Sequence, residues 1–106
     1  MSLLNKKCVP CEEGAKLFTK EQIEEGLKQL VSWKVIDDSH LKKVYTFPDF
    51  KTAWAFVNEV ADLAESEGHH PDILLSWGKV VITLFTHSVK GLTENDFILA
   101  AKIDQL

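Results

Sequence analysis

The feature of the sequence that most constrains the fold is a long amphipathic segment between Asp49 and Gly68. Asp49 is suited to an N-cap, where its carboxylate can accept a hydrogen bond from a free backbone N–H of the first turn. Gly68 is suited to the left-handed position that ends a helix. Apolar residues recur between them at the spacing of one helical face, namely Phe50, Ala53, Trp54, Val57, Val60, Ala61 and Ala64. The segment predicts a helix that packs one face against the rest of the domain.

Two shorter helices are predicted, one before this segment and one after it. Thr19 and Gln22 have the spacing of a capping box. The apolar stripe that follows them consists of Ile23, Leu27 and Leu30. Thr93 is suited to cap the last helix, whose apolar residues are Phe97, Ile98, Ala101 and Ile103.

Strand-like segments flank the long helix in two pairs. Residues 33–36 and 41–47 are separated by the turn-forming residues 37–40 and predict a β-hairpin. Residues 73–77 and 80–86 predict a second hairpin around Gly78.

The predicted order is helix, hairpin, helix, hairpin, helix. This order is typical of an α+β fold with a four-stranded antiparallel sheet and three helices packed on one face. Residues 1–18 show no periodicity and are interpreted as an irregular N-terminal arm, and residues 19–106 as a single domain. The opposite sheet face and at least one strand edge would be uncovered, which proteins often resolve by oligomerising.

Composition excludes several classes of function. The 106 residues carry a formal net charge of -4 and no long basic stretch, which argues against direct binding to nucleic acid phosphates. No apolar run approaches the roughly 20 residues that span a bilayer, so no membrane partner is expected. The first residues, MSLLNKKCVPCEEG, lack the apolar core of a signal peptide. We therefore expect a cytoplasmic protein.

The two cysteines, Cys8 and Cys11, are spaced as C-V-P-C. Such a pair can be a redox dithiol or half of a zinc site. A redox motif would follow a buried strand, whereas Lys6 and Lys7 precede this pair. A structural zinc site needs two further ligands, and there is no second cysteine pair. We interpret the pair as loop thiols.

Three of the four histidines lie in the segment 65–96. His69 and His70 stand between Gly68 and Pro71, off regular structure, and His87 follows the last strand. The hypothesis is that the three share one pocket. A three-histidine zinc site with an activated water is one chemistry for it, and metal-free acid–base catalysis is the other. Neighbours in an extended segment project to opposite sides, which argues mildly against zinc.

Two carboxylates and one further histidine complete the polar candidates. Glu65, four residues before His69, is either a solvated helix-end group or a partner that orients a histidine. Asp96, three residues after Thr93, is suited to a capping box and could also support a histidine. His40 lies in the predicted hairpin turn, and no role is predicted for it.

These motifs resemble a known family. The similarity is carried by Glu65 with H-H-P-D at 69–72, K-V at 79–80, I-T-L at 82–84, T-H at 86–87 and G-L-T-E-x-D at 91–96, preceded by Trp33 and by F-x-D-F-x-x-A-x-x-F-x-x-x-V-A at 47–61. Over roughly Thr19 to Leu106 the chain is similar to pterin-4a-carbinolamine dehydratase, and the arm with Cys8 and Cys11 lies outside this similarity.

The resemblance implies the same α+β fold, assembled as a homodimer or homotetramer. It implies dehydration of a 4a-hydroxytetrahydropterin, the 4a-carbinolamine, to the quinonoid dihydropterin, with no metal and no cofactor beyond the pterin substrate. This hydro-lyase reaction recycles the cofactor of aromatic amino acid hydroxylases, so a partner in that pathway is implied. The alternative is a protein-binding module or transcriptional coactivator, since an animal relative stabilises dimers of a homeodomain factor.

The resemblance also implies a role for each candidate. His69, His70 and His87 would be the catalytic set, with His69 and His87 as the acid–base pair on opposite sides of the pterin. His70, with Pro71, would bind and orient the ring. The supporting residues would be Asp96 and Glu65. Phe85 stands where the family often has a small residue, which puts the fit of the substrate in question.

Overall fold

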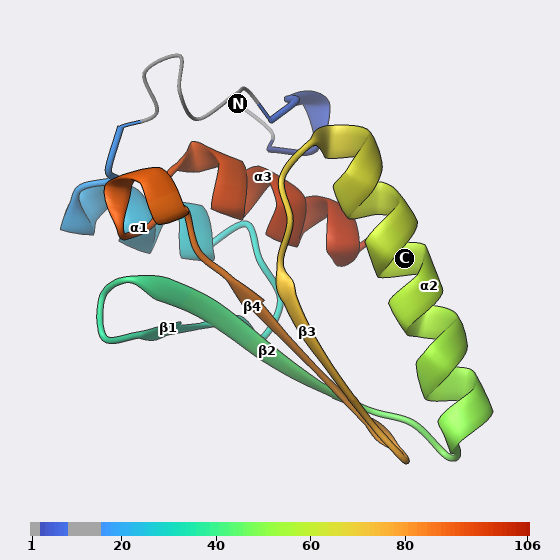
Figure 1. The fold of residues 1–106 in the computed structure, drawn as a ribbon. Coiled ribbons are helices and arrows are strands. Elements are labelled where there is room, and N and C mark those ends of the chain that lie inside the picture. The colour runs from blue at the N-terminus through green and yellow to red at the C-terminus, as the bar shows by residue number, and fades with distance from the viewer. Residues whose placement is uncertain (1–2, 9–15) are drawn as a thin grey trace.

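Every helix and hairpin expected from the sequence is present in the computed structural model, which describes residues 3–8 and 16–106. The elements are η1 (Leu3–Asn5), α1 (Lys20–Leu27), β1 (Lys34–Ile36), β2 (His40–Thr46), α2 (Phe50–Glu67), β3 (Asp72–Ser76), β4 (Lys79–Leu84), η3 (His87–Val89) and α3 (Glu94–Ile103). The α+β fold with a four-stranded antiparallel sheet is confirmed (Figure 1).

The sheet has the strand order β1-β2-β4-β3, with β2 and β4 paired at its centre from Leu41↔Leu84 to Thr46↔Lys79. Alternate side chains point to opposite faces, and the inward ones form the core with α3. Core side chains with almost no exposure include Leu41, Val80, Ile82, Leu84, Phe97, Ile98 and Leu99. Because α3 is covered on nearly every side, its apolar residues surround the helix rather than form a single stripe.

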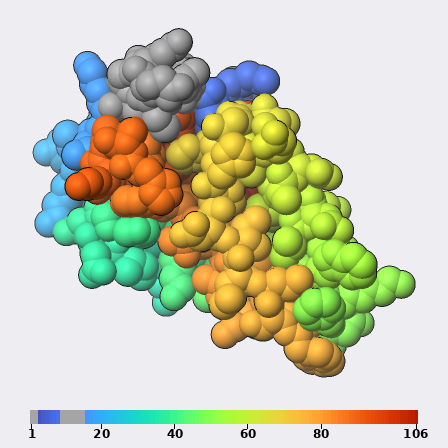
Figure 2. All heavy atoms as spheres, viewed as in Figure 1, coloured from blue at the N-terminus to red at the C-terminus, as the bar shows by residue number. Residues whose placement is uncertain are grey.

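The long helix α2 has the predicted caps. The Asp49 carboxylate accepts a hydrogen bond from the Thr52 N–H at 2.8 Å, and Gly68 ends the helix at φ 67°. Phe50 and Trp54 are exposed on its outer side. The first turn of α2 and the tip of the β3–β4 hairpin lie together at one end of the molecule (Figure 2).

Helix α1 is shorter than predicted. Its capping box is formed, with Thr19 and Gln22 bonded reciprocally at 2.8 and 3.1 Å. The helix ends at Leu27, so Leu30 lies beyond it. Gly26 packs on α3, because a Cβ at this position would lie 2.5 Å from the Phe97 ring. A glycine that costs up to about 1 kcal/mol of intrinsic helix propensity here permits a close helix–helix contact.

All four strands also differ from the predicted bounds by one or two residues. His40 is the first residue of β2 and not part of the turn, because Asp37 and Asp38 form a tight turn with φ of 53° and 58°. The last strand ends at Leu84 instead of Thr86. Beyond it, Thr86 pairs with Gly91 in an isolated bridge that encloses η3.

Residues 3–8 of the N-terminal arm pack on the domain. The Leu3 side chain is buried in the core, and Lys6 forms an ion pair with Glu94 at the start of α3. Cys8 lies beside the end of α2, where its N–H donates to Glu67 at 3.1 Å. The predicted loop thiol Cys11 lies outside the described residues.

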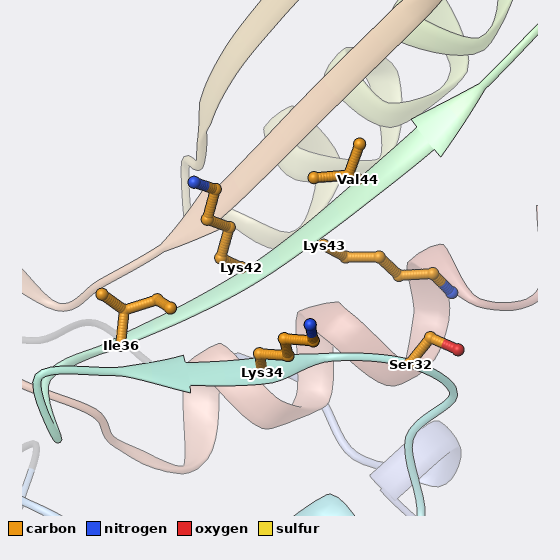
Figure 3. Close-up of a pocket in the computed structure, with 6 residues that line it drawn as sticks. All are labelled: Ser32, Lys34, Ile36, Lys42, Lys43 and Val44. Atoms are coloured by element: carbon orange, nitrogen blue, oxygen red, sulfur yellow. The ribbon is translucent and has the colours of Figure 1, made fainter.

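The outer face of the sheet is open, as predicted. Val44 and Leu74 are 51% and 56% exposed on it, and both register with Val81 of β4. A hollow lies beside β1 and β2 (Figure 3), lined by Ser32, Lys34, Ile36, Lys42, Lys43 and Val44. Across the described residues, no helix combines the length and apolar character of a membrane span.

Candidate functional site

His69 is held by the corner between α2 and β3. Gly68 turns the chain away from the helix, and the His69 N–H closes the helix end on the Ala64 carbonyl at 3.3 Å. The side chain is only 6% exposed, and its Nε2 lies 2.6 Å from Oδ1 of Asp96. A carboxylate accepts hydrogen bonds, so Nε2 is the donor in this contact, and Nδ1 takes no part in it.

Asp96 is the fully buried centre of this network. Its Oδ2 accepts hydrogen bonds from the Thr93 N–H at 2.9 Å and from the Thr86 hydroxyl at 2.7 Å. The two threonine hydroxyls lie 3.0 Å apart. Asp96 therefore caps α3 and holds His69 at the same time, so the two contacts considered for it coexist. A buried network whose members are all paired fixes the ring orientation of His69.

His70 and Glu65 form a second pair, but on the surface. The His70 Nε2 lies 2.9 Å from Oε1 of Glu65, with side chains 62% and 82% exposed. Glu65 contacts His70 and not the neighbouring His69, which has Asp96 as its partner. Exposed pairs of this kind contribute at most about 1 kcal/mol, so the contact with Glu65 holds His70 only weakly.

His87 is exposed and begins the short helix η3. Its ring meets that of Phe85 nearly at a right angle, with centroids 4.7 Å apart. The Phe85 ring also stacks flat on His40, at 4.3 Å and 7°. The sequence reasoning assigned His40 to a turn and missed this contact. The register of β2 and β4, in which Leu41 pairs with Leu84, is the signal that would have predicted it.

The structure brings only some of the predicted site residues into contact with one another. Thr86 of the buried network directly precedes His87, so one chain segment carries both. Within the described residues, the hydrogen-bonded network around His69 includes neither His70 nor His87, and no three His, Cys, Asp or Glu side chains lie close enough to hold a metal ion. The hollow in Figure 3 is lined by no histidine.

A further polar cluster adjoins this region. The Glu67 carboxylate accepts one hydrogen bond from Lys102 Nζ at 2.6 Å and another from the Cys8 N–H. Burial acts to raise the pKa of Glu67, but these two bonds outweigh it and the pKa is lowered. Burial, followed by the Glu67 charge, raises the pKa of the Cys8 thiol to about 12. Cys8 is thus a neutral, unreactive thiol in the folded protein.

Comparison with known proteins identifies the motif set. The family model "Pterin 4 alpha carbinolamine dehydratase" matches residues 16–106. A protein of Alkaliphilus metalliredigens, named provisionally as a pterin-4-alpha-carbinolamine dehydratase, is 50% identical over 105 residues, covering 98% of this chain and 95% of the relative. This coverage includes the N-terminal arm. The similarity therefore begins before Thr19, the residue at which the motifs alone had placed its start.

Two solved structures share the fold. One, titled a transcriptional coactivator/pterin dehydratase from Brucella melitensis, has a TM-score of 0.79 and 33% identity, covering 85% of this chain and 97% of that one. The other, titled a pterin dehydratase-like protein identified as a RuBisCO assembly factor in the alpha-carboxysome, has a TM-score of 0.60 and 28% identity over 73% of this chain and 90% of that one. With the family model matching most of its length, the chain belongs to the pterin 4 alpha carbinolamine dehydratase family.

Proposed function

We propose that this protein dehydrates a 4a-hydroxytetrahydropterin to the quinonoid dihydropterin by acid–base catalysis with histidines. The observation that carries the proposal is the buried Asp96–His69 contact at 2.6 Å, in a chain whose T-H motif places His87 next to the same network. A histidine held by a buried carboxylate keeps one tautomer and one ring orientation, as a proton-transferring group must.

The reaction needs two proton transfers but has no net consumption of protons. A histidine acid protonates the C4a hydroxyl, the C–O bond breaks, and water leaves. The N5 lone pair forms the new C=N bond as water leaves, and a histidine base then removes the N5 proton, whose electron pair stays on N5. His69, through Nδ1, and His87 are the two exchanging groups, and His70 with Pro71 binds the ring. No metal or further cofactor is required, and the product would re-enter aromatic amino acid hydroxylation after reduction.

The experiment is to measure the dehydration of a chemically prepared 4a-hydroxytetrahydropterin by absorbance. Wild type should accelerate it above the spontaneous rate, and the His69→Ala, His87→Ala double variant should not. Lys51→Ala is the matched control, because Lys51 is exposed in the first turn of α2, at the other end of that helix from His69. Activity should persist in chelator without stoichiometric zinc; loss of activity with a bound metal would overturn the acid–base mechanism.

A second candidate function is a protein-binding module. The titles of the two solved relatives name coactivator and assembly-factor roles for those proteins. Here, Trp54 and Trp77 are 53% and 68% exposed at one end of the molecule, and aromatic side chains favour binding interfaces. Absence of any acceleration by the wild-type protein would favour this function over the enzyme.

We propose that the protein assembles as a homodimer or homotetramer. The open sheet face and the edge strands β1 and β3 support this, since uncovered edges tend to pair. Sedimentation at micromolar concentration should show at least a dimer, unchanged by reductant. A monomer, or dissociation in reductant, would contradict the proposal.

A further inference from the structure

A column of three rings links strand β2 to the candidate catalytic histidine of η3. His40 stacks on Phe85 at 4.3 Å, and Phe85 meets His87 at 4.7 Å. We propose that His40 is a positioning residue for His87, acting through Phe85. The inference rests on the proposed function in that His87 is taken to exchange a proton with the pterin.

The first ring of the column is itself fixed. His40 begins β2 on the outer face of the sheet, and it lies opposite Phe85 one step beyond the Leu41↔Leu84 pair. Its Nδ1 is 2.6 Å from the hydroxyl of Ser39, which sets the rotation of the imidazole. The interplanar angle of 7° to Phe85 is that of an aromatic stack, so His40 restricts the phenyl ring in turn.

His87 needs such a restraint more than His69 does. It is exposed on a three-residue 3-10 helix, where side chains exchange rotamers readily. The nearly perpendicular contact with Phe85 is a preferred geometry for aromatic pairs. It favours one orientation of the imidazole. Phe85 thus supports the ring of His87.

The expected effect follows from the size of one aromatic contact. His40→Ala should lower kcat about two- to ten-fold and leave KM nearly unchanged, because the lost restraint concerns proton transfer and not ground-state binding. His40→Phe keeps a flat ring and should restore most of the rate, whereas His40→Leu keeps only apolar bulk and should not. Lys42→Ala, on the same strand and face, is the matched control and should behave as wild type.

A double-mutant cycle separates positioning from a general structural effect. In the His87→Ala background, His40→Ala should have no further effect on the residual rate, because the group it positions is gone. An equal loss in both backgrounds, or a wild-type kcat in His40→Ala, would overturn the proposal. So would a rate that His40→Leu restores as well as His40→Phe.

A second readout does not depend on activity. The proton NMR shift of the His87 ring should carry a ring-current displacement from Phe85, and His40→Ala should move that shift towards the value in Phe85→Ala. An unchanged shift in His40→Ala would show that His40 does not hold the column, whatever the enzyme does. If wild type lacks dehydratase activity, the proposed function fails, and this measurement still decides the column.

Discussion

The two histidines proposed to transfer protons are held in opposite ways. His69 is buried, and its partner Asp96 accepts two further hydrogen bonds, one from Thr93 at the N-cap of α3 and one from Thr86 in the β4–η3 connection. His87 is exposed, and its ring contacts another ring. A buried polar group that loses its partner leaves an uncompensated donor or acceptor, whereas an exposed ring that loses a contact is solvated. Under the proposed function, a change near Asp96 should therefore affect both catalysis and stability, whereas a change in η3 should affect catalysis alone.

The largest expected effect separates these two regions directly. His69→Ala and His87→Ala should each lower kcat by about 10²–10⁴-fold, the usual loss for a positioned acid or base. Only His69→Ala should also lower the free energy of unfolding, by about 1–3 kcal/mol, because it leaves the buried Asp96 carboxylate short of a donor. Thermal unfolding measured beside turnover checks both. Equal losses of stability in the two variants would contradict the contrast between the buried His69 and the exposed His87.

Substitutions of Asp96 should give the next largest effect on stability and turnover. Different substitutions test different contacts of this side chain. Asp96→Ala removes the helix cap together with the partner of His69. Asp96→Asn keeps an oxygen for the Thr93 N–H but replaces a charged acceptor, and it should cost about 1–3 kcal/mol of stability and lower kcat. Thr86→Val, of similar shape, should cost about 1 kcal/mol and change kcat less. A Thr86→Val that loses more activity than Asp96→Asn would contradict the central place of Asp96.

How far such contacts could be predicted depends on how local their causes are. The α2 caps and the Thr93–Asp96 cap follow from residues three or fewer positions apart, and the sequence predicted each of them. The prediction that α1 includes Leu30 was wrong, because the helix ends at Leu27 and the chain continues in i→i+3 turns. The contact of Gly26 with Phe97 was not predicted, because it joins two helices that are far apart in the sequence. The His40–Phe85 stack was missed because it requires the register of two strands that are separated by α2 and β3. Sequence patterns indicate that strands pair, but they fix that register only weakly.

His70 should show a smaller effect of a different kind. His70→Ala should chiefly raise KM, since loss of ground-state binding alone leaves turnover largely unchanged. Its stability should stay within about 0.5 kcal/mol of wild type, as expected for an exposed side chain. Glu65→Ala is the companion variant and should raise KM less, because the pair is solvated on both sides. A kcat loss as large as that of His69→Ala would instead place His70 in proton transfer.

The smallest effect concerns the acid stability of the buried region and comes from Glu67, two residues before His69. The pKa of Glu67 is lowered from its ordinary value of 4.5, because the bonds from Lys102 and Cys8 outweigh the effect of burial. A lowered folded-state pKa means that the ionised group stabilises the fold above pH 4.5, and that this contribution is lost as pH falls through the folded pKa. Wild type should therefore unfold at a higher temperature than Glu67→Gln at pH 7, and this difference in unfolding temperature should shrink as the pH falls below 4.5.

Glu59→Gln, at an exposed site on the same helix, is the control, and its difference from wild type should not change with pH. If the difference in unfolding temperature between wild type and Glu67→Gln stays constant down to pH 3, the carboxylate acts by packing and not by charge. The buried and exposed regions would then differ in burial alone.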